Sequence, residues 1–290
     1  MFFWGLSYIW SKYVFELYSP LTTIFFRLVI SFVSLAVFIY ATTNDFKIGR
    51  KDFPLLALSA LFNPFLYFIG ENFGLQLVSA SLSAIIVATI PLFAPFIAWY
   101  YYKEKLKIMN TVGLLISFAG LLLIILKKDF SLNADPLGLL LLSLAVVSAL
   151  FYMVILKKLS DNYSPVKIIM WQNLLGAVYF LPFFLFFDLD GVLETKPGTN
   201  VIISLLMLGI FSSSLAYVLY TYALKHIGII KSSLYTNLIP VFTALFSFYL
   251  LNEIFTFVKI LGMITVISGL ILSEYGNVKE TAKTATKKPG

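Results

Sequence analysis

Long apolar runs separated by short polar gaps fill most of the chain. A helix that crosses a bilayer needs about 20 consecutive apolar residues. Ten runs approach or exceed that length, and we place them at residues 2–18, 20–41, 53–74, 79–101, 108–126, 137–156, 165–187, 201–224, 229–251 and 255–275. The pattern therefore predicts an all-α membrane protein with ten transmembrane helices.

A pattern in the fourth and fifth runs recurs in the last two runs at one constant displacement. The first copy reads Pro91, Phe93, Tyr100, Glu104, Gly113 and Gly120, and the second reads Pro240, Phe242, Tyr249, Glu253, Gly262 and Gly269. Self-similarity at half the chain length indicates an internal duplication. We expect one five-helix repeat at 1–130, a second at 137–276, and a disordered basic cytoplasmic tail at 277–290.

An odd number of spans in each half has a topological consequence. If one half has five spans, the second half must enter the membrane upside down relative to the first. The expected fold is therefore two inverted five-helix repeats. Inverted repeats are an architecture of secondary transporters, whose substrate site lies near the membrane midplane where the halves meet.

Composition and charge support a membrane protein and argue against other classes. The chain has 290 residues, of which 60% are hydrophobic and 12% are charged, whereas soluble domains are nearer half apolar and a quarter charged. The net charge of +7 does not indicate nucleic-acid binding, because most Lys and Arg lie in gaps between apolar runs. The absence of cysteine excludes a disulfide framework and a cysteine metal site.

The distribution of Lys and Arg predicts the orientation. Most of them lie in every second gap and in the tail, while a minority that includes Lys127 and Lys128 lies on the other side. The positive-inside rule then places both termini in the cytoplasm of a multi-pass protein in the cell (inner) membrane. The first run has no charged lead and no cleavage site, so we do not expect a signal peptide; a true start upstream of Met1 stays open.

Several short motifs carry a family resemblance over nearly the whole chain. They are Trp4-Gly5, Lys12, Ser19-Pro20, Arg27, Leu215-Ala216-Tyr217, Tyr222-Ala223-Leu224-Lys225, and the segment from Pro240 through Glu253 to Gly269. With these motifs the chain resembles the ten-helix drug/metabolite transporter superfamily, and specifically its EamA family. The resemblance implies a proton-linked or facilitative carrier that exports amino acids, other metabolites or drugs by alternating access. The chain departs from the family at Lys103 and Asn252, where a Gly usually precedes the Glu.

Two ionisable residues within apolar runs are candidates for substrate contact, because charges inside a membrane are costly. Arg27 lies about 10 Å into its span and Glu71 about 27 Å along its own, both in the outer part of the membrane. An Arg27–Glu71 pair is one hypothesis. The two residues then bind the charged ends of a zwitterion, or Glu71 takes up a proton. The alternative is a static structural pair.

Polar and aromatic residues follow helical spacing on several runs. Groups that faced lipid would lack hydrogen-bond partners, so such stripes are expected to face a cavity. The further substrate-binding candidates are Asn63, Tyr67, Trp171, Gln172, Asn173, Tyr217, Tyr220, Thr236 and Asn237. Contacts between helices and aromatic belts at the membrane interfaces are the alternatives.

Prolines within the runs are candidate hinges, because a proline removes one helical hydrogen bond. Pro91 and Pro240 occupy equivalent positions in the two halves, and Pro64 interrupts the third run. Matching interruptions indicate a transport site or hinge. A static kink is the alternative.

The sequence lacks enzyme signatures. It has one His, no Gly-rich phosphate loop and no His-Glu-x-x-His motif, so we expect no enzyme, cofactor or metal.

The leading hypothesis is a secondary transporter that moves small organic solutes by alternating access, with amino-acid export first. The alternatives are a multidrug or nucleoside-like efflux carrier, then a membrane enzyme or a channel. Expected partners are a small-molecule substrate, protons as a candidate coupling ion, and membrane lipids; the oligomeric state stays open.

Overall fold

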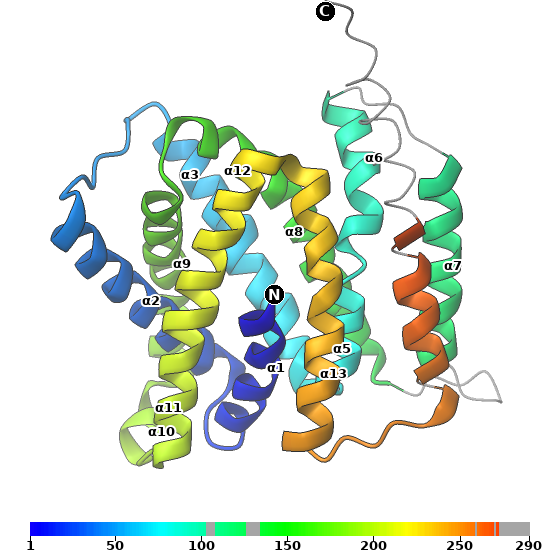
Figure 1. Ribbon diagram of the computed structural model, residues 1–290. Coiled ribbons are helices and arrows are strands. Elements are labelled where there is room, and N and C mark those ends of the chain that lie inside the picture. The colour runs from blue at the N-terminus through cyan, green and yellow to red at the C-terminus, as the bar shows by residue number, and fades with distance from the viewer. Residues whose placement is uncertain (103–107, 126–133, 259, 270, 273–290) are drawn as a thin grey trace, which may run out of the picture.

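Helices make up the architecture seen in the computed structural model, which describes residues 1–102, 108–125, 134–258, 260–269 and 271–272 (Figure 1). No strand occurs within these ranges. The predicted tail at 277–290 and Glu104 lie outside the described residues. The helices are α1 Phe2–Phe15, α2 Pro20–Thr42, α3 Phe53–Ala60, η1 Leu61–Leu66, η2 Ile69–Phe73, α4 Gly74–Leu77, α5 Ala80–Val87, α6 Ile90–Tyr102, α7 Ile108–Ile125, α8 Pro136–Asn162, α9 Pro165–Phe187, α10 Leu189–Glu194, α11 Thr199–Met207, η3 Leu208–Ala216, α12 Tyr217–Leu234, η4 Tyr235–Asn237 and α13 Leu238–Leu250. A further apolar helix covers Ile260–Gly269.

Within the described part of the chain, six helical stretches are long and apolar enough to cross a membrane. They are Pro20–Thr42, Phe53–Leu77, Ala80–Tyr101, Pro136–Asn162, Pro165–Phe187 and Thr199–Ile227. Shorter apolar helices cover Thr111–Gly120, Leu238–Leu250 and Ile260–Gly269. Each of the ten predicted runs therefore contains helix, which confirms an all-helical membrane protein.

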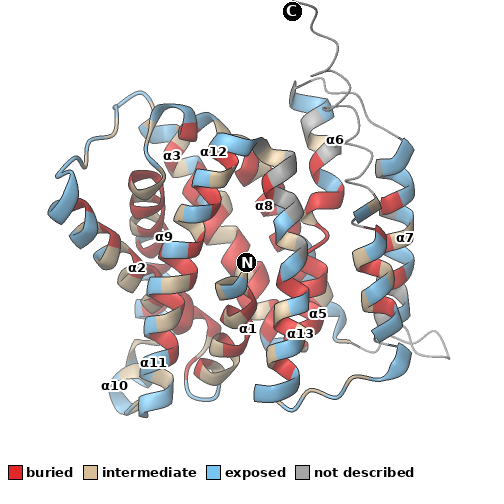
Figure 2. Cartoon of the chain, viewed as in Figure 1, coloured by how far each residue is buried: buried red, intermediate tan, exposed pale blue. Residues whose placement is uncertain are grey.

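Buried and exposed residues are arranged as expected for a protein surrounded by lipid. Figure 2 shows the buried residues concentrated on the faces that helices turn toward one another. Large apolar side chains cover much of the outside, among them Phe186 and Tyr40. Because lipid tails are as apolar as these side chains, their exposure costs little in a bilayer.

Proline and short polar residues determine where several spans begin. Pro20, Pro136 and Pro165 each open a helix, where the missing N–H would have no helical partner in any case. Ser19 and Asp135 precede two of these prolines and accept hydrogen bonds from backbone N–H groups of the first turn. Such caps stabilise helix starts by about 1 kcal/mol each, which explains why these boundaries agree with the prediction.

Two spans contain wide π-helical turns at equivalent positions in the two halves. In the first half η1 includes Asn63, whose φ of −143° and ψ of 117° are not helical. In the second half η3 covers the equivalent stretch. Such π turns are rare and occur often at functional sites.

One predicted gap is wrong. We expected residues 225–228 to separate two spans, but α12 continues as helix to Leu234 and bends at the end that is uppermost in Figure 1. This stretch contains a single Gly and no Pro, so helical hydrogen bonding is not forced to stop there. The equivalent connection in the first half does leave the helix, at Val78 and Ser79.

The repeated glycines lie where two helices cross closely. A Cβ on Gly120 in α7 would stand 2.6 Å from the Val266 nitrogen, and one on Gly269 would stand 2.5 Å from the Ser117 nitrogen. Ser117 also donates a hydrogen bond to the Val266 carbonyl. Because Gly120 contacts Gly262 and Gly269 contacts Gly113, the two helices run antiparallel and each presents equivalent residues to the other.

Candidate functional site

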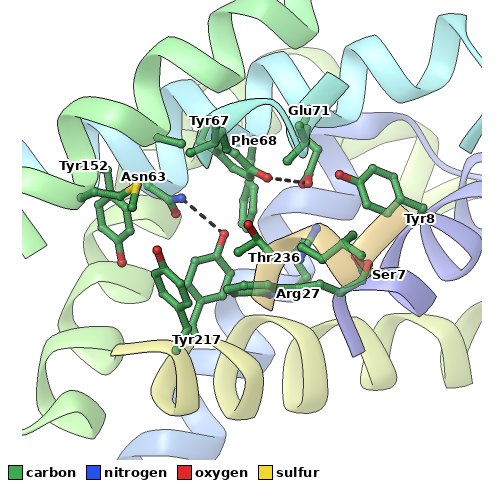
Figure 3. A pocket seen from close by; sticks show the side chains of 17 residues that line it. Ser7, Tyr8, Arg27, Asn63, Tyr67, Phe68, Glu71, Tyr152, Tyr217 and Thr236 are labelled. Carbon is green, nitrogen blue, oxygen red and sulfur yellow. Dashed lines mark hydrogen bonds between the residues drawn. The ribbon is translucent and has the colours of Figure 1, made fainter. Parts of the chain in front are cut away.

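A cavity lies inside the helix bundle and receives side chains from both halves of the chain (Figure 3). Its walls come from α1, α2, the interrupted span Phe53–Leu77, α5, α6, α8, α12, η4 and α13. The accessible part has a volume of about 70 Å³, which is enough for several water molecules. The cavity is therefore large enough to admit the polar end of a small solute.

Arg27 of α2 reaches this cavity from a buried position, with 2% of its surface exposed. Its Nε donates a hydrogen bond of 2.9 Å to Ser213 Oγ, and its guanidinium carbon lies 4.2 Å from the centre of the Phe68 ring. Among the described residues, its two terminal nitrogens have no protein hydrogen-bond partner. A guanidinium stays charged even when buried, so these nitrogens are suited to an anionic group.

Glu71 of η2 supplies the opposite charge and is the only carboxylate among the described residues that line the cavity. Its Oε1 accepts a hydrogen bond of 2.9 Å from the Tyr67 hydroxyl, and its Oε2 lies 3.5 Å from Asn72 Nδ2. Figure 3 shows the Tyr8 hydroxyl beside the same carboxylate. A carboxylate in the wall of the cavity is suited to a cationic group of a solute.

Arg27 and Glu71 do not form the direct pair that we considered from the sequence. Arg27 contacts Ser213 and Phe68 instead, and within the described part of the chain no ion pair joins it to Glu71. The reason is geometric, since Glu71 is held by hydroxyl and amide donors on its own span and by Tyr8 of α1. The two charges therefore line one cavity while remaining separate.

Aromatic residues form another part of the wall. Trp4 lies edge-on to Tyr217, with ring centres 5.0 Å apart, and its ring centre is 5.3 Å from that of Tyr220. The Tyr217 hydroxyl accepts a hydrogen bond of 3.3 Å from Asn63 Nδ2, which the non-helical backbone of Asn63 directs inward. This wall offers ring faces and a few polar groups to a solute.

Seven of the predicted substrate-binding residues line this cavity. They are Arg27, Asn63, Tyr67, Glu71, Tyr217, Tyr220 and Thr236. The η4 backbone includes Asn237, but its side chain lies outside the described ones. The structure thus brings together residues from four predicted spans that are far apart in sequence.

Gln172 and Asn173 do not line the cavity, although we predicted them as site residues. Gln172 Oε1 accepts a hydrogen bond of 3.2 Å from the Tyr152 hydroxyl, and its Nε2 donates to Ser59 Oγ. Asn173 Nδ2 donates to Ser31 Oγ at 2.5 Å and to the Ser213 carbonyl at 3.2 Å. Both amides thus connect α9 to neighbouring helices, which is the alternative noted for polar groups within spans.

Trp171 also lies away from the cavity. It lies near the start of α9, in contact with the segment that follows α2. Its Nε1 donates a hydrogen bond of 2.9 Å to the Phe46 carbonyl. Beside it, Lys167 Nζ lies 2.5 Å from Asp45 Oδ2, and this hydrogen bond lowers the pKa of the exposed Asp45 carboxyl. Trp171 therefore holds an extramembrane segment in place.

The three predicted hinge prolines lie at helix interruptions. Pro64 lies in η1 directly after the non-helical Asn63. Pro91 is the second residue of α6, after the break at Ala88 and Thr89, and Pro240 is the third residue of α13, after the 3-10 turn η4. The interruptions next to Pro91 and Pro240 are equivalent in the two halves, and movement at them stays a prediction.

Trp4, Ser7, Tyr8 and Tyr152 line the cavity but were not among the predicted site residues. The first three lie three and four residues apart and thus on one face of α1, a spacing that could have identified them. Tyr152 gave no such indication, because it is one tyrosine in a long apolar run. Within the described residues, no cluster of three or more His, Cys, Asp or Glu could hold a metal ion.

Comparison with known proteins identifies the class of molecule to which this cavity belongs. The model of the EamA-like transporter family matches residues 1–126 and 136–275. The chain is 26% identical to an uncharacterized transporter of Archaeoglobus fulgidus, over 93% of this chain and 92% of the relative. It is 26% identical to the uncharacterized transporter YcxC of Bacillus subtilis, over 99% and 92% of the two chains.

A plant relative and a solved structure extend the comparison. The chain is 28% identical to a WAT1-related chloroplastic protein of Arabidopsis thaliana, over 94% of this chain and 67% of the relative. One crystal structure shares the fold with a TM-score of 0.71 at 14% identity, covering 93% of this chain and 92% of the other. With the family model matching nearly its whole length, this chain belongs to the EamA-like transporter family.

Proposed function

We propose that the protein is a secondary transporter that binds a zwitterionic solute, first of all an amino acid, in the central cavity and exports it across the cell (inner) membrane. The observation that carries this proposal is the separation of Arg27 from Glu71 within one cavity. The unpartnered terminal nitrogens of Arg27 suit a carboxylate, and the Glu71 carboxylate suits an ammonium group. Direct contact between the two side chains would leave neither available.

Alternating access requires two arrangements of similar energy, which two inverted repeats provide. The antiparallel crossing of α7 and Ile260–Gly269 supports inversion, because equivalent residues of the two halves meet there head to tail. The matching interruptions near Pro91 and Pro240 support it as well. We therefore propose that the halves at 1–130 and 137–276 are inverted, with both termini cytoplasmic.

Glu71 is the candidate for proton coupling, since it is the carboxylate of the cavity. If Glu71 takes up a proton during transport, we expect Glu71→Gln to remove the pH dependence of transport. The Gln side chain still offers the Tyr67 hydroxyl a hydrogen-bond acceptor. The measurement is efflux of labelled amino acid from vesicles at several pH values. A pH profile unchanged by Glu71→Gln contradicts proton coupling through this residue.

Substrate binding is tested in purified protein reconstituted in liposomes, with a panel of labelled amino acids. Arg27→Lys keeps the charge but loses the planar fork of donors. We expect Arg27→Lys and Glu71→Gln each to weaken binding by roughly 10-fold or more, the usual effect of losing a charge-assisted hydrogen bond. Glu16→Gln, at an exposed position after α1, is the matched control.

The alternative is efflux of ring-bearing drugs or nucleoside-like solutes, which the Trp4–Tyr217–Tyr220 wall favours. Counterflow of a labelled aromatic solute, together with no counterflow of any amino acid, selects that alternative. Conduction without counterflow indicates a channel and contradicts both carrier proposals.

A further inference from the structure

A second cavity lies beyond the central one along the same helices. Its volume is about 470 Å³. In α1 the central cavity is lined by Tyr8 and the second by Lys12, one helical turn further on. In the segment that includes α5, the central cavity is lined by Val87 and the second by Ser81. The two cavities therefore follow one another along a single path toward the predicted outer side.

A layer of tightly packed side chains includes residues that lie, along α1, α4 and α5, between the residues that line the two cavities. It consists of Tyr8, Ile9, Leu75, Ala80, Ala84 and Ile239, each at most 5% exposed, and we call it the outer layer. These residues come from α1, α4, α5 and α13. A path from the central cavity to the second cavity along these helices therefore crosses the outer layer.

Glu253 holds the start of α5 from the opposite half of the chain. Its Oε2 accepts hydrogen bonds from the Ser81 hydroxyl at 3.0 Å and from the Ser81 backbone N–H at 3.4 Å. The first N–H groups of a helix have no helical partner and carry partial positive charge, so a carboxylate there is stabilising. Asn252, with a φ of 53°, turns the chain after α13 so that Glu253 points back toward α5.

Two neighbouring contacts close the same end of the molecule. The Tyr13 hydroxyl donates to the Leu250 carbonyl at 3.0 Å, and Lys12 Nζ donates to the Val78 carbonyl at 2.8 Å. The first of these again joins α1 of one half to the end of α13 of the other. Two polar contacts between the halves, from Glu253 to Ser81 and from Tyr13 to Leu250, thus lie near the outer layer.

We propose that Glu253 is a positioning residue that keeps the outer layer closed by holding the first turn of α5. Ala80 and Ala84 belong to both α5 and the outer layer, so release of Ser81 by Glu253 lets α5 move and opens the path. The inference rests on the proposed alternating access, but its test needs no substrate.

The test uses accessibility of a single cysteine, which is practical because the natural chain has none. Ala84→Cys places a thiol in the outer layer, and a membrane-impermeant maleimide is applied to right-side-out vesicles. Glu253→Gln removes the charge with little change in shape. We expect it to raise the labelling rate of Ala84→Cys roughly fivefold or more, as loss of one charge-assisted hydrogen bond allows.

Matched variants make the result decisive. Glu194→Gln changes an exposed carboxylate of α10 on the same predicted side, and we expect it to leave the labelling of Ala84→Cys unchanged. Asn200→Cys places a thiol on the predicted outer surface, and its labelling shows that each variant inserts normally. Equal labelling of Ala84→Cys with Glu253→Gln and with Glu194→Gln overturns the proposal. If Glu253→Gln does not fold, Ser81→Ala decides in its place, with a smaller increase expected. Because labelling is independent of transport, failure of amino-acid transport does not affect this outcome.

Discussion

At the scale of single residues, Arg27 and Glu71 show what the sequence predicts well. A charge in an apolar run is costly, so both were recognised as candidates from their position alone. Their partners were not recognised, because Ser213 and Tyr8 are brought to them by tertiary packing. The sequence therefore predicts which charged side chains lie inside the protein more readily than which residues each of them contacts.

Asn173 shows the limit of that approach, because the sequence alone does not distinguish a polar side chain that binds substrate from one that holds two helices together. Its contacts with Ser31 and Ser213 predict a packing role. We expect Asn173→Ala to lower stability by about 1 kcal/mol, as for hydrogen bonds between membrane helices, and to leave substrate affinity unchanged. Thermal unfolding in detergent and the dissociation constant measure the two effects.

A surface amide provides the control for that experiment. Asn200 is exposed near the start of α11, so Asn200→Ala changes neither quantity. A tenfold loss of affinity by Asn173→Ala at unchanged stability would instead place Asn173 in the substrate site.

At the scale of helices, the apolar runs and their caps predict most boundaries, whereas interruptions inside a span are harder to foresee. Pro64 predicts a kink, but the π turns of η1 and η3 depend on how neighbouring helices accommodate a wider backbone. The continuation of α12 past residue 228 was missed because the polar residues Lys225 and His226, followed by Gly228, resemble a loop in sequence. Local polarity thus does not by itself stop a helix.

The crossing of α7 with Ile260–Gly269 yields a prediction for the element scale. A methyl group on Gly120 would overlap backbone atoms of the facing helix, and overpacking typically costs 1–3 kcal/mol. We expect Gly120→Ala to lower the unfolding temperature by several degrees, measured by differential scanning fluorimetry. Gly191→Ala in α10 is the control, because nothing lies within 4 Å of its added methyl group; an equal effect of both variants refutes close packing as the cause.

At the scale of the whole molecule, the all-helical membrane architecture was predictable, because the backbone groups of a chain in lipid must form their hydrogen bonds within the protein and its outer surface must be apolar. The depth and shape of the cavity were not, since they depend on side chains from both halves. The orientation follows from the charges in the gaps between spans and stays a prediction.

Cysteine labelling tests the orientation directly. Thr43 follows α2 and Thr199 begins α11, and both are exposed. The predicted topology places them on opposite sides of the membrane. We expect Thr199→Cys to react with an impermeant reagent on intact cells, and Thr43→Cys to react only after the membrane is permeabilised. The opposite pattern inverts the molecule and reverses the sides assigned to every loop. Reaction of both in intact cells contradicts the odd number of spans predicted between the two positions.

The packing of α2 along α9 has a mechanical consequence for any transport cycle. At one end Asp188 accepts hydrogen bonds from Ser19 and Thr22, and at the other Lys167 is bound to Asp45. Contacts at both ends resist sliding of one helix along the other. We therefore expect α2 and α9 to move as one rigid unit that joins the two halves. We therefore expect any conformational change during transport to concentrate in the helices that lack such contacts at both ends.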